Sequence, residues 1–320
     1  MHFIRLIRPL NLIIIALTMY GLGWYFDPME GCSCTYIVTD WPFFWLVFST
    51  VLIAAGGNII NDYFDVRADR VNKPHRLIIT KHIKKRTAIV MHWTINLIAF
   101  SIALYLSWIM DSFWYLFIHL FSINVLWFYS MYFKRQFLTG NVLIAALTAL
   151  VPVLVGIFFY QQNLANTEWY NMELFPFNLQ GSTPRIIMYI SLGLAIFAFL
   201  LNLAREVIKD MEDVDGDKKL HAKTLPISWG YKKSKWFVGI ALFAAICAAG
   251  MLIYLIEAFT IMTVLPGIIA AILILIAIIL VSSASTKLDY RRINHCLKLA
   301  MTVGLLTPVY WKIISTYVQF

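Results

Sequence analysis

Two acidic stretches of the chain repeat one spacing of oxygen-bearing side chains. The first set is Asn58, Asp62, Asp65 and Asp69, and the second set is Glu206, Asp210, Asp213 and Asp217. Corresponding members lie at a constant offset, so both sets follow the spacing i, i+4, i+7, i+11. At about 100° per residue, this spacing places four side chains within an arc of roughly 60° on a helix. Each motif therefore predicts a helix that presents a row of oxygen ligands.

The ligand types indicate what these rows would bind. Oxygen ligands without a His or Cys cluster suit magnesium, which keeps several waters and shares its coordination shell with substrate phosphates. We therefore expect two magnesium ions and a diphosphate. The expected metal ligands are Asn58, Asp62, Asp65, Asp69, Asp210, Asp213 and Asp217. The six aspartates are also the expected catalytic residues, and Asn58, Asn61 and Glu206 are expected to contact substrate.

Composition places both motifs in a membrane protein. The chain has 320 residues, of which 61% are hydrophobic and 13% charged, and its mean hydropathy is +0.74. The charged share is about half of that in soluble proteins. Stretches of about 20 apolar residues, long enough to cross a bilayer, lie near 9–26, 42–62, 88–110, 113–133, 140–160, 185–205, 236–256, 258–283 and 294–317. We expect an all-α, polytopic bundle of about nine transmembrane helices that forms one domain over 1–320.

Basic residues predict the orientation of these helices. Of the 26 Lys and Arg, all except Arg185 and Lys312 lie on the side of the amino terminus. Because cytoplasmic loops collect Lys and Arg, we expect the amino terminus and both acidic motifs on the cytoplasmic side of the cell membrane. The first stretch lacks an A-x-A-like cleavage site, which predicts a retained span. Topology and contact with anionic lipid or phosphorylated substrate explain the net charge of +9, so no nucleic-acid partner is expected.

The first motif also has a structural interpretation, in which a solvated helix end pairs its acids with Arg67 and Arg70. That interpretation does not explain the recurrence at 206–217. Carboxylates at a membrane edge are costly unless they are paired or bind a metal. Gly56 and Gly57, directly before the motif, would let another helix or a ligand approach closely. A binding site is therefore the favoured interpretation.

The second motif ends less clearly than the first. Glu212 and Asp215 fall away from the helical face of Asp210, so we expect them in solvent or against the following basic loop. Gly216 favours a helix end at that point. The orientation of Asp217 is therefore the least defined among the expected ligands.

Basic segments follow both motifs, at 73–86 and 218–223. The topology alone predicts many of these residues. A subset is expected to neutralise a departing diphosphate or to hold a phosphate on a second substrate. We expect Arg76, Lys81 and Lys223 to belong to this subset.

In their sequence context, the two motifs resemble the UbiA superfamily of intramembrane prenyltransferases. The runs NDYFDVRADRVNKPHR (61–76) and REVIKDMEDVDGDKKLHAKTLPISWG (205–230) are similar in particular to the branch that adds a second isoprenoid chain to a prenylated glycerol phosphate. The similarity spans nearly the whole chain. It includes Arg8, Pro9, Asn11, Tyr129, Ser130, Lys134, Gly140 and Asn141.

This resemblance implies a reaction and its partners. A prenyl chain, geranylgeranyl in that branch, would pass from its diphosphate to the hydroxyl of a lipid-like acceptor, giving an ether lipid and diphosphate. The allylic cation would lie among aromatic side chains that stabilise it and exclude water. The implied substrate contacts are Arg8, Asn11, Tyr129, Ser130 and Lys134. Membrane lipids are further partners, and the sequence does not define an oligomeric state.

One segment departs from the branch. After the first motif the branch continues with an Arg-Pro-Ile-Pro-Ser-Gly run, whereas this chain reads RLIITK from Arg76 to Lys81. Loss of two prolines and a glycine predicts a differently shaped loop, which we expect to help choose the acceptor. An aromatic acceptor, such as a quinone precursor or a porphyrin, is therefore the alternative within the superfamily. A transporter is a remote alternative, because transporter sites lie near the bilayer midplane and these acids lie at the ends of the predicted spans.

Overall fold

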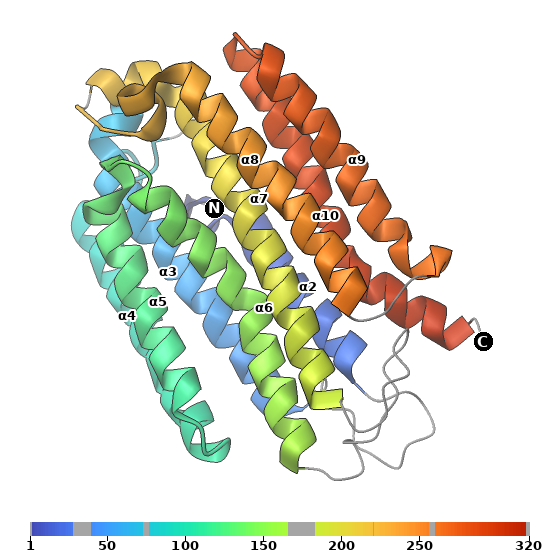
Figure 1. Ribbon diagram of the computed structural model, residues 1–320. Helices are drawn as coiled ribbons and strands as arrows, with labels where there is room; N and C mark the ends of the chain where they lie inside the picture. Colours follow the sequence, from blue (N-terminus) through green and yellow to red (C-terminus); the bar gives the residue numbers. More distant parts are fainter. Residues whose placement is uncertain are drawn as a thin grey trace. The chain divides into compact units, whose positions relative to one another are not determined.

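The computed structural model describes residues 2–27, 40–72, 77–165, 183–219, 221–255 and 260–317. These residues are almost entirely helical (Figure 1), and their one non-helical pairing is an isolated bridge between Ile79 and Ile83. The elements are α1 (His2–Ile7), α2 (Pro9–Phe26), α3 (Trp41–Asn72), α4 (Lys85–Ile109), α5 (Phe113–Met131), the 3₁₀ helix η3 (Phe133–Arg135), α6 (Thr139–Ala165), α7 (Thr183–Lys219), α8 (Leu225–Leu255), α9 (Ile261–Ser283) and α10 (Lys287–Tyr317).

Nine of the described helices, α2 to α10, are long and apolar enough to cross a membrane. The predicted all-α, nine-span architecture is therefore confirmed. The two helices that carry the acidic motifs are longer than their predicted spans of 42–62 and 185–205. α3 continues to Asn72 and α7 to Lys219. Both motifs thus lie on continuous helix, as their spacing predicts.

The contacts divide the chain into two compact units. Unit 1 comprises Met1–Leu17, Thr39–Ile144 and Asp213–Ser228, and unit 2 comprises Thr18–Val38, Ala145–Glu212 and Trp229–Phe320. The first acidic motif belongs to unit 1. The expectation of a single domain over 1–320 stays a prediction.

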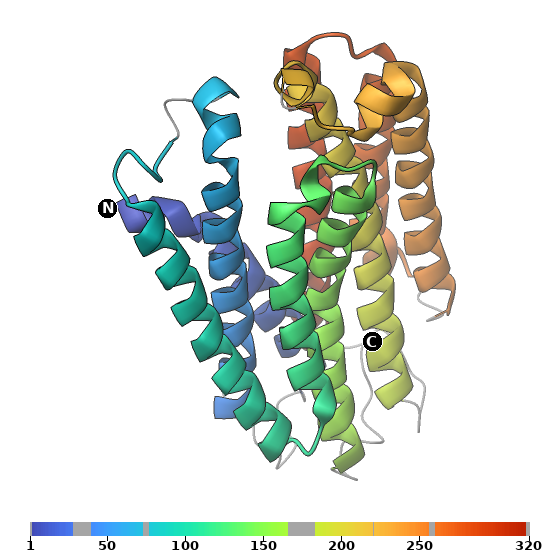
Figure 2. The same ribbon diagram turned by 90° about the vertical axis from the view of Figure 1, so that its left-hand side faces the viewer.

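In unit 1, α3 packs along α4 and α5, which run antiparallel to each other (Figure 2). Small residues permit this contact on two sides of α3. A Cβ added to Gly56 would lie 2.8 Å from Nδ2 of Asn96 on α4, and one added to Gly57 would lie 2.9 Å from Cδ1 of Leu126 on α5. The two glycines therefore admit neighbouring helices directly before the first motif.

The segment after the first motif is a tight apolar turn. The Thr80 amide donates to the Ile83 carbonyl at 2.8 Å, and the His82 amide donates to the Ile78 carbonyl at 2.9 Å. Ile79 is buried in a cluster that α1, α3 and α4 supply. The run at 77–83, which lacks the prolines and glycine of the related branch, thus folds as a turn that is anchored by a buried side chain.

In unit 2, α9 and α10 lie side by side (Figure 1). The Trp311 indole donates from Nε1 to the Thr263 carbonyl at 3.0 Å. The next residue, Lys312, is buried and donates from Nζ to the Asp27 carbonyl at 2.6 Å. One of the two exceptions to the basic-residue asymmetry is therefore a buried cation that ties α10 to the end of α2.

The end of α7 differs from the expectation at Gly216. The helix runs through this residue to Lys219, and the Ala222 amide then donates to the Asp217 carbonyl at 3.0 Å. His221 has φ of 57°, so the helix ends in a left-handed residue. Because the helix stop lies beyond Asp217, this aspartate keeps the helical spacing of the second motif and the expected helix end at Gly216 is wrong.

Candidate active site

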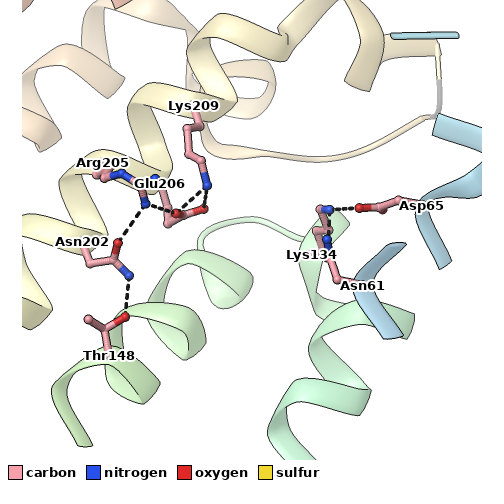
Figure 3. A network of polar contacts seen from close by, with 8 residues as sticks. All are labelled: Asn61, Asp65, Lys134, Thr148, Asn202, Arg205, Glu206 and Lys209. Carbon is pink, nitrogen blue, oxygen red and sulfur yellow. Dashed lines mark hydrogen bonds and ion pairs between the residues drawn. The ribbon is translucent and has the colours of Figure 1, made fainter. Parts of the chain in front are cut away.

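The carboxylates of the first motif are paired with cations from distant parts of unit 1. Arg8 Nη2 lies 2.5 Å from Oδ1 of Asp62, whose side chain is 18% exposed. Lys134 Nζ forms an ion pair with Oδ2 of Asp65, whose side chain is 13% exposed (Figure 3). Largely desolvated carboxylates need such partners, because an isolated charge is costly at a membrane edge. Both cations were expected to bind substrate.

The local backbone places Arg8 in an unusual conformation. It separates α1 from α2 and has φ of 56°. Pro9 begins α2, and a proline disfavours helical conformation in the residue before it. A non-glycine residue in the left-handed region carries strain, which occurs preferentially at functional sites. The break between the two helices thus allows the guanidinium of Arg8 to reach Asp62.

Lys134 lies on η3, the short helix after α5. Its Nζ also donates to Oδ1 of Asn61 at 3.1 Å, so it bridges two positions of α3 (Figure 3). Gly140 on α6 permits this placement. A Cβ at Gly140 would lie 2.7 Å from the Phe133 carbonyl oxygen and 3.0 Å from Cα of Lys134.

The other unit 1 residues of the expected site differ in their hydrogen bonds and in their exposure. Asn58 donates from Nδ2 to the Ile7 carbonyl at 2.9 Å, so its amide oxygen is oriented away from that bond. Ser130 is buried and donates to the Leu126 carbonyl at 2.8 Å. Tyr129 and Asp69 are half-buried, and Asn11 is exposed in the first turns of α2.

The expected phosphate-binding lysines are exposed. Lys81 lies on the turn after the first motif, next to His82, whose ring stacks on that of His2 with centroids 3.8 Å apart. Desolvation and the neighbouring His82 lower the pKa of His2. Lys223 donates its backbone amide to the Arg135 carbonyl at 2.8 Å, which fixes its segment against η3. Arg76, the third expected residue of this kind, lies outside the described residues.

The second motif occupies the last third of α7. Asp210, Asp213 and Asp217 are all half-buried. Asp213 and Asp217 belong to unit 1, as the first motif does, and Asp210 belongs to unit 2. The structure thus assigns two of these three aspartates to the compact unit that contains Asp62 and Asp65.

Glu206, expected to contact substrate, is paired with two cations of its own helix. Lys209 Nζ donates to its two carboxylate oxygens at 2.7 and 2.9 Å, and Arg205 Nη1 donates to Oε1 at 3.0 Å (Figure 3). The network continues from Arg205 to Asn202 Oδ1 at 3.3 Å and from Asn202 Nδ2 to Thr148 of α6 at 2.8 Å. Our sequence interpretation did not single out Arg205 and Lys209. Their spacing with Asn202 and Glu206, i, i+3, i+4, i+7, is the signal that indicates one polar face.

Glu212, expected in solvent or against the basic loop of its motif, is paired with a cation of another helix. Its Oε1 accepts from Arg291 Nε of α10 at 2.7 Å, and its side chain is 15% exposed. The sequence interpretation therefore missed its partner, which is more than seventy positions away in the chain. Asp215, the other acid placed off the motif face, is exposed as expected.

The side chains of the first motif fit magnesium by type. Asn58, Asp62 and Asp65 supply hard oxygen ligands. The charge of each aspartate is balanced by a basic side chain. Within the described residues, no three His, Cys, Asp or Glu side chains lie close enough together to hold a metal ion.

These observations define a class of protein. It is an integral, multi-pass helical membrane protein in which two spanning helices each extend into a row of acidic residues. More specifically, the chain belongs to the UbiA prenyltransferase family, whose model matches residues 12–302. The resemblance that the two motifs indicate is therefore confirmed, and the chain is a prenyltransferase.

Individual relatives agree with this assignment. The chain is 27% identical over 310 residues to the digeranylgeranylglyceryl phosphate synthase of Methanosphaera stadtmanae, covering 95% of this chain and 97% of that protein. The solved structure of a digeranylgeranylglyceryl phosphate synthase has a TM-score of 0.68 at 24% identity and covers 98% of both chains. A UbiA homologue from Archaeoglobus fulgidus bound to GPP and Mg²⁺ has a TM-score of 0.59 at 16% identity, covering 96% of this chain and 99% of that one. The last two show that the fold is shared.

Proposed function

We propose that this enzyme transfers a geranylgeranyl chain from its diphosphate to the hydroxyl of a prenylated glycerol phosphate, in a magnesium-dependent reaction. The observation that carries this proposal is the pairing of Asp62 and Asp65 with Arg8 and Lys134 in a chain similar over 95% of its length to a digeranylgeranylglyceryl phosphate synthase. This arrangement combines oxygen ligands for a metal with cations for a diphosphate. The solved homologue with GPP and Mg²⁺ supports both the donor class and the metal.

The chain's own residues account for the binding of the donor. Asp62, Asp65 and Asp69 from α3 and Asp210, Asp213 and Asp217 from α7 would hold two magnesium ions, with Asn58 as a neutral ligand. When bound, the metal neutralises charge that grows on the leaving diphosphate. Arg8 and Lys134 then change partner, from a carboxylate to a diphosphate oxygen. A guanidinium or ammonium that makes this exchange stabilises the leaving group without leaving a carboxylate unpaired.

The proposed transfer exchanges one C–O bond for another. The bond between the allylic carbon and the diphosphate breaks, and the electron pair leaves with the diphosphate. The acceptor oxygen forms the new ether bond, and its proton passes to the released diphosphate. No strong base is needed, because an allylic cation is a powerful electrophile. Apolar and aromatic side chains around the cation would keep water from capturing it first.

The acceptor has one alternative within the family. The turn at Lys81 lacks the prolines and glycine of the related branch and is anchored by Ile79, so its shape differs in the part of the chain expected to choose the acceptor. A quinone precursor or a porphyrin is the second candidate. The similarity over 95% of the chain favours the glycerol phosphate. The transporter alternative does not agree with membership of the UbiA prenyltransferase family.

We also propose that both motifs face the cytoplasm of the cell. All Lys and Arg except Arg185 and Lys312 lie on the side of the motifs, and Lys312 is a buried residue rather than part of a loop. A cytoplasmic site gives water-soluble magnesium and a charged diphosphate direct access. The prenyl tails of both substrates would remain in the membrane.

An in vitro assay with purified enzyme tests this proposal. Geranylgeranyl diphosphate is offered with prenylated glycerol phosphate, a quinone precursor and a porphyrin, and the products are identified by mass spectrometry. We expect the ether lipid, with one diphosphate released per transfer, and loss of both products when EDTA removes magnesium. Exclusive prenylation of an aromatic acceptor would refute the glycerol phosphate assignment, and absence of diphosphate release would refute the reaction.

Two variants test the metal ligands in the same assay. Asp62→Ala and Asp210→Ala each remove a proposed ligand from α3 or α7, so we expect transfer to fall by at least about 100-fold. Neither residue is fully buried, so both variants should reach the membrane in folded form. Near-normal turnover in either variant would contradict the metal assignment.

A further inference from the structure

The network around Glu206 contains an arginine whose guanidinium is only partly hydrogen-bonded. Arg205 donates from Nη1 to Asn202 and Glu206. Its Nε is buried, and among the described residues no acceptor lies within hydrogen-bond distance of it. A buried donor without a partner is destabilising. The guanidinium is nevertheless reachable, since 21% of the Arg205 side chain is exposed.

The neighbouring side chains hold this arginine in place. Glu206 binds Arg205 through Oε1 and binds Lys209 through both carboxylate oxygens. Asn202 is nearly fully buried, and its bond to Thr148 ties the same face of α7 to α6 (Figure 3). Two cations therefore share one carboxylate on a fixed face of a membrane-spanning helix. Charged side chains within a span are costly and mark candidate functional sites. Two cations with one carboxylate leave a net positive charge, which suits an anionic ligand.

The position of Arg205 along α7 indicates which anion. It lies five residues before Asp210 and eight before Asp213, which at 1.5 Å per residue is about 7.5 and 12 Å toward the membrane interior. The acceptor hydroxyl must approach the allylic carbon from the hydrocarbon side of the diphosphate. In a prenylated glycerol phosphate, the free hydroxyl and the phosphate ester are on neighbouring carbons. The acceptor phosphate would therefore lie one to two helical turns deeper than the proposed diphosphate site.

We propose that Arg205, oriented by Glu206 and assisted by Lys209, binds the phosphate of the acceptor lipid. This inference rests on the proposed function and assigns one substrate group to side chains that the metal site does not use. A guanidinium presents a planar set of donors that matches two phosphate oxygens, and a lysine adds a point charge. Glu206 is then a positioning residue that keeps both cations on one face of α7.

The test compares two acceptors that differ only in the phosphate. Transfer to the prenylated glycerol phosphate and to the corresponding prenylated glycerol is measured for the wild type and for Arg205→Gln. We expect Arg205→Gln to lower kcat/KM for the phosphorylated acceptor by about 10- to 100-fold and to leave kcat/KM for the dephosphorylated one and KM for the prenyl diphosphate unchanged. Lys209→Gln should act in the same direction with a smaller effect.

The matched control is Arg185→Gln. Arg185 is an exposed arginine near the opposite end of the same helix. Its replacement should leave kcat/KM unchanged for both acceptors. Equal losses with both acceptors would overturn the proposal, because they would show that Arg205 only stabilises α7. A rise in KM for the prenyl diphosphate alone would overturn it by assigning Arg205 to the donor. If Arg205→Gln does not fold, Arg205→Lys, which keeps the charge but loses the planar set of donors, allows the same comparison.

This test remains distinct from that of the proposed function. A wild-type enzyme that makes no ether lipid refutes the reaction itself. If the wild-type enzyme makes the ether lipid and the Arg205→Gln variant keeps the preference for the phosphorylated acceptor, only the assignment of Arg205 is refuted.

Discussion

At the scale of single residues, charge pairing explains how acids are accommodated at the ends of membrane-spanning helices. Asp62 has a cationic partner from the break between α1 and α2, Asp65 has one from η3, and Glu212 has one from α10. A carboxylate in such a setting costs several kcal/mol if its partner is removed. We infer that the pairs of the first motif serve two states, one with the cation on the carboxylate and one with the cation on substrate.

Lys134 provides a prediction at this scale. In Lys134→Met, Asp65 loses a competing cation, so magnesium should bind more readily while the leaving diphosphate loses a positive charge. We expect a rate of transfer reduced by roughly 10- to 100-fold, together with a lower magnesium concentration for half-maximal activity. Steady-state assays over a magnesium titration measure both quantities.

The control for this variant is Arg135→Gln, which removes the neighbouring exposed cation of η3. It should leave the magnesium dependence unchanged. A Lys134→Met enzyme that needs more magnesium than the wild type would contradict the exchange of partners.

At the scale of elements, close packing determines where these side chains can lie. η3 approaches α6 so closely that only hydrogen fits at position 140, where an added Cβ would meet the Phe133 carbonyl oxygen at 2.7 Å. The backbone of η3 cannot yield as a flexible side chain can. The position of Lys134 therefore depends on a glycine that has no polar group of its own.

Gly140→Ala should displace η3 and with it the Lys134 ammonium. We expect transfer to fall by about 10-fold or more, because a misplacement of about 1 Å can cost a factor of 100 in rate. Activity and thermal unfolding are measured together in detergent. Gly250→Ala is the control, since an added Cβ at that position on α8 meets nothing within 4 Å and alanine favours the helix. Full activity in Gly140→Ala would contradict this role of the packing.

At the level of the whole molecule, the asymmetry of charge predicts how the nine described spans are oriented. The segments that follow the motifs carry exposed lysines, such as Lys81 and Lys223. Arg185 lies near the start of α7, at the opposite end of that helix from its motif. Because lysine and arginine collect in cytoplasmic loops, these positions should differ in the compartment that they face.

Cysteine accessibility measures this difference directly. In a variant with the four native cysteines replaced by alanine, Lys81→Cys should react with an impermeant maleimide only when the cytoplasmic side is open. Arg185→Cys should react in intact cells. The two positions are both exposed, so burial does not confound the comparison. Labelling of Lys81→Cys in intact cells would reverse the proposed orientation.

The all-α class, the nine spans and the family follow from the sequence alone. Hydropathy and helical spacing are local properties, so they can be recognised in the sequence without knowledge of which helices pack together. The same reasoning placed Asp62, Asp65, Asp210 and Asp213 on helical faces. It failed at Gly216, because a helix tolerates a glycine when the surrounding structure supports its continuation.

The pairing of the charged side chains depends on the three-dimensional fold. Arg8 reaches Asp62 across 54 positions, Lys134 reaches Asp65 across 69, and Arg291 reaches Glu212 across 79. Such partners depend on how distant helices pack, and packing follows from shape complementarity that no local pattern encodes. For this reason the acids and the cations Arg8 and Lys134 could be named from the sequence, whereas the pairing of each cation with its carboxylate is a property of the fold.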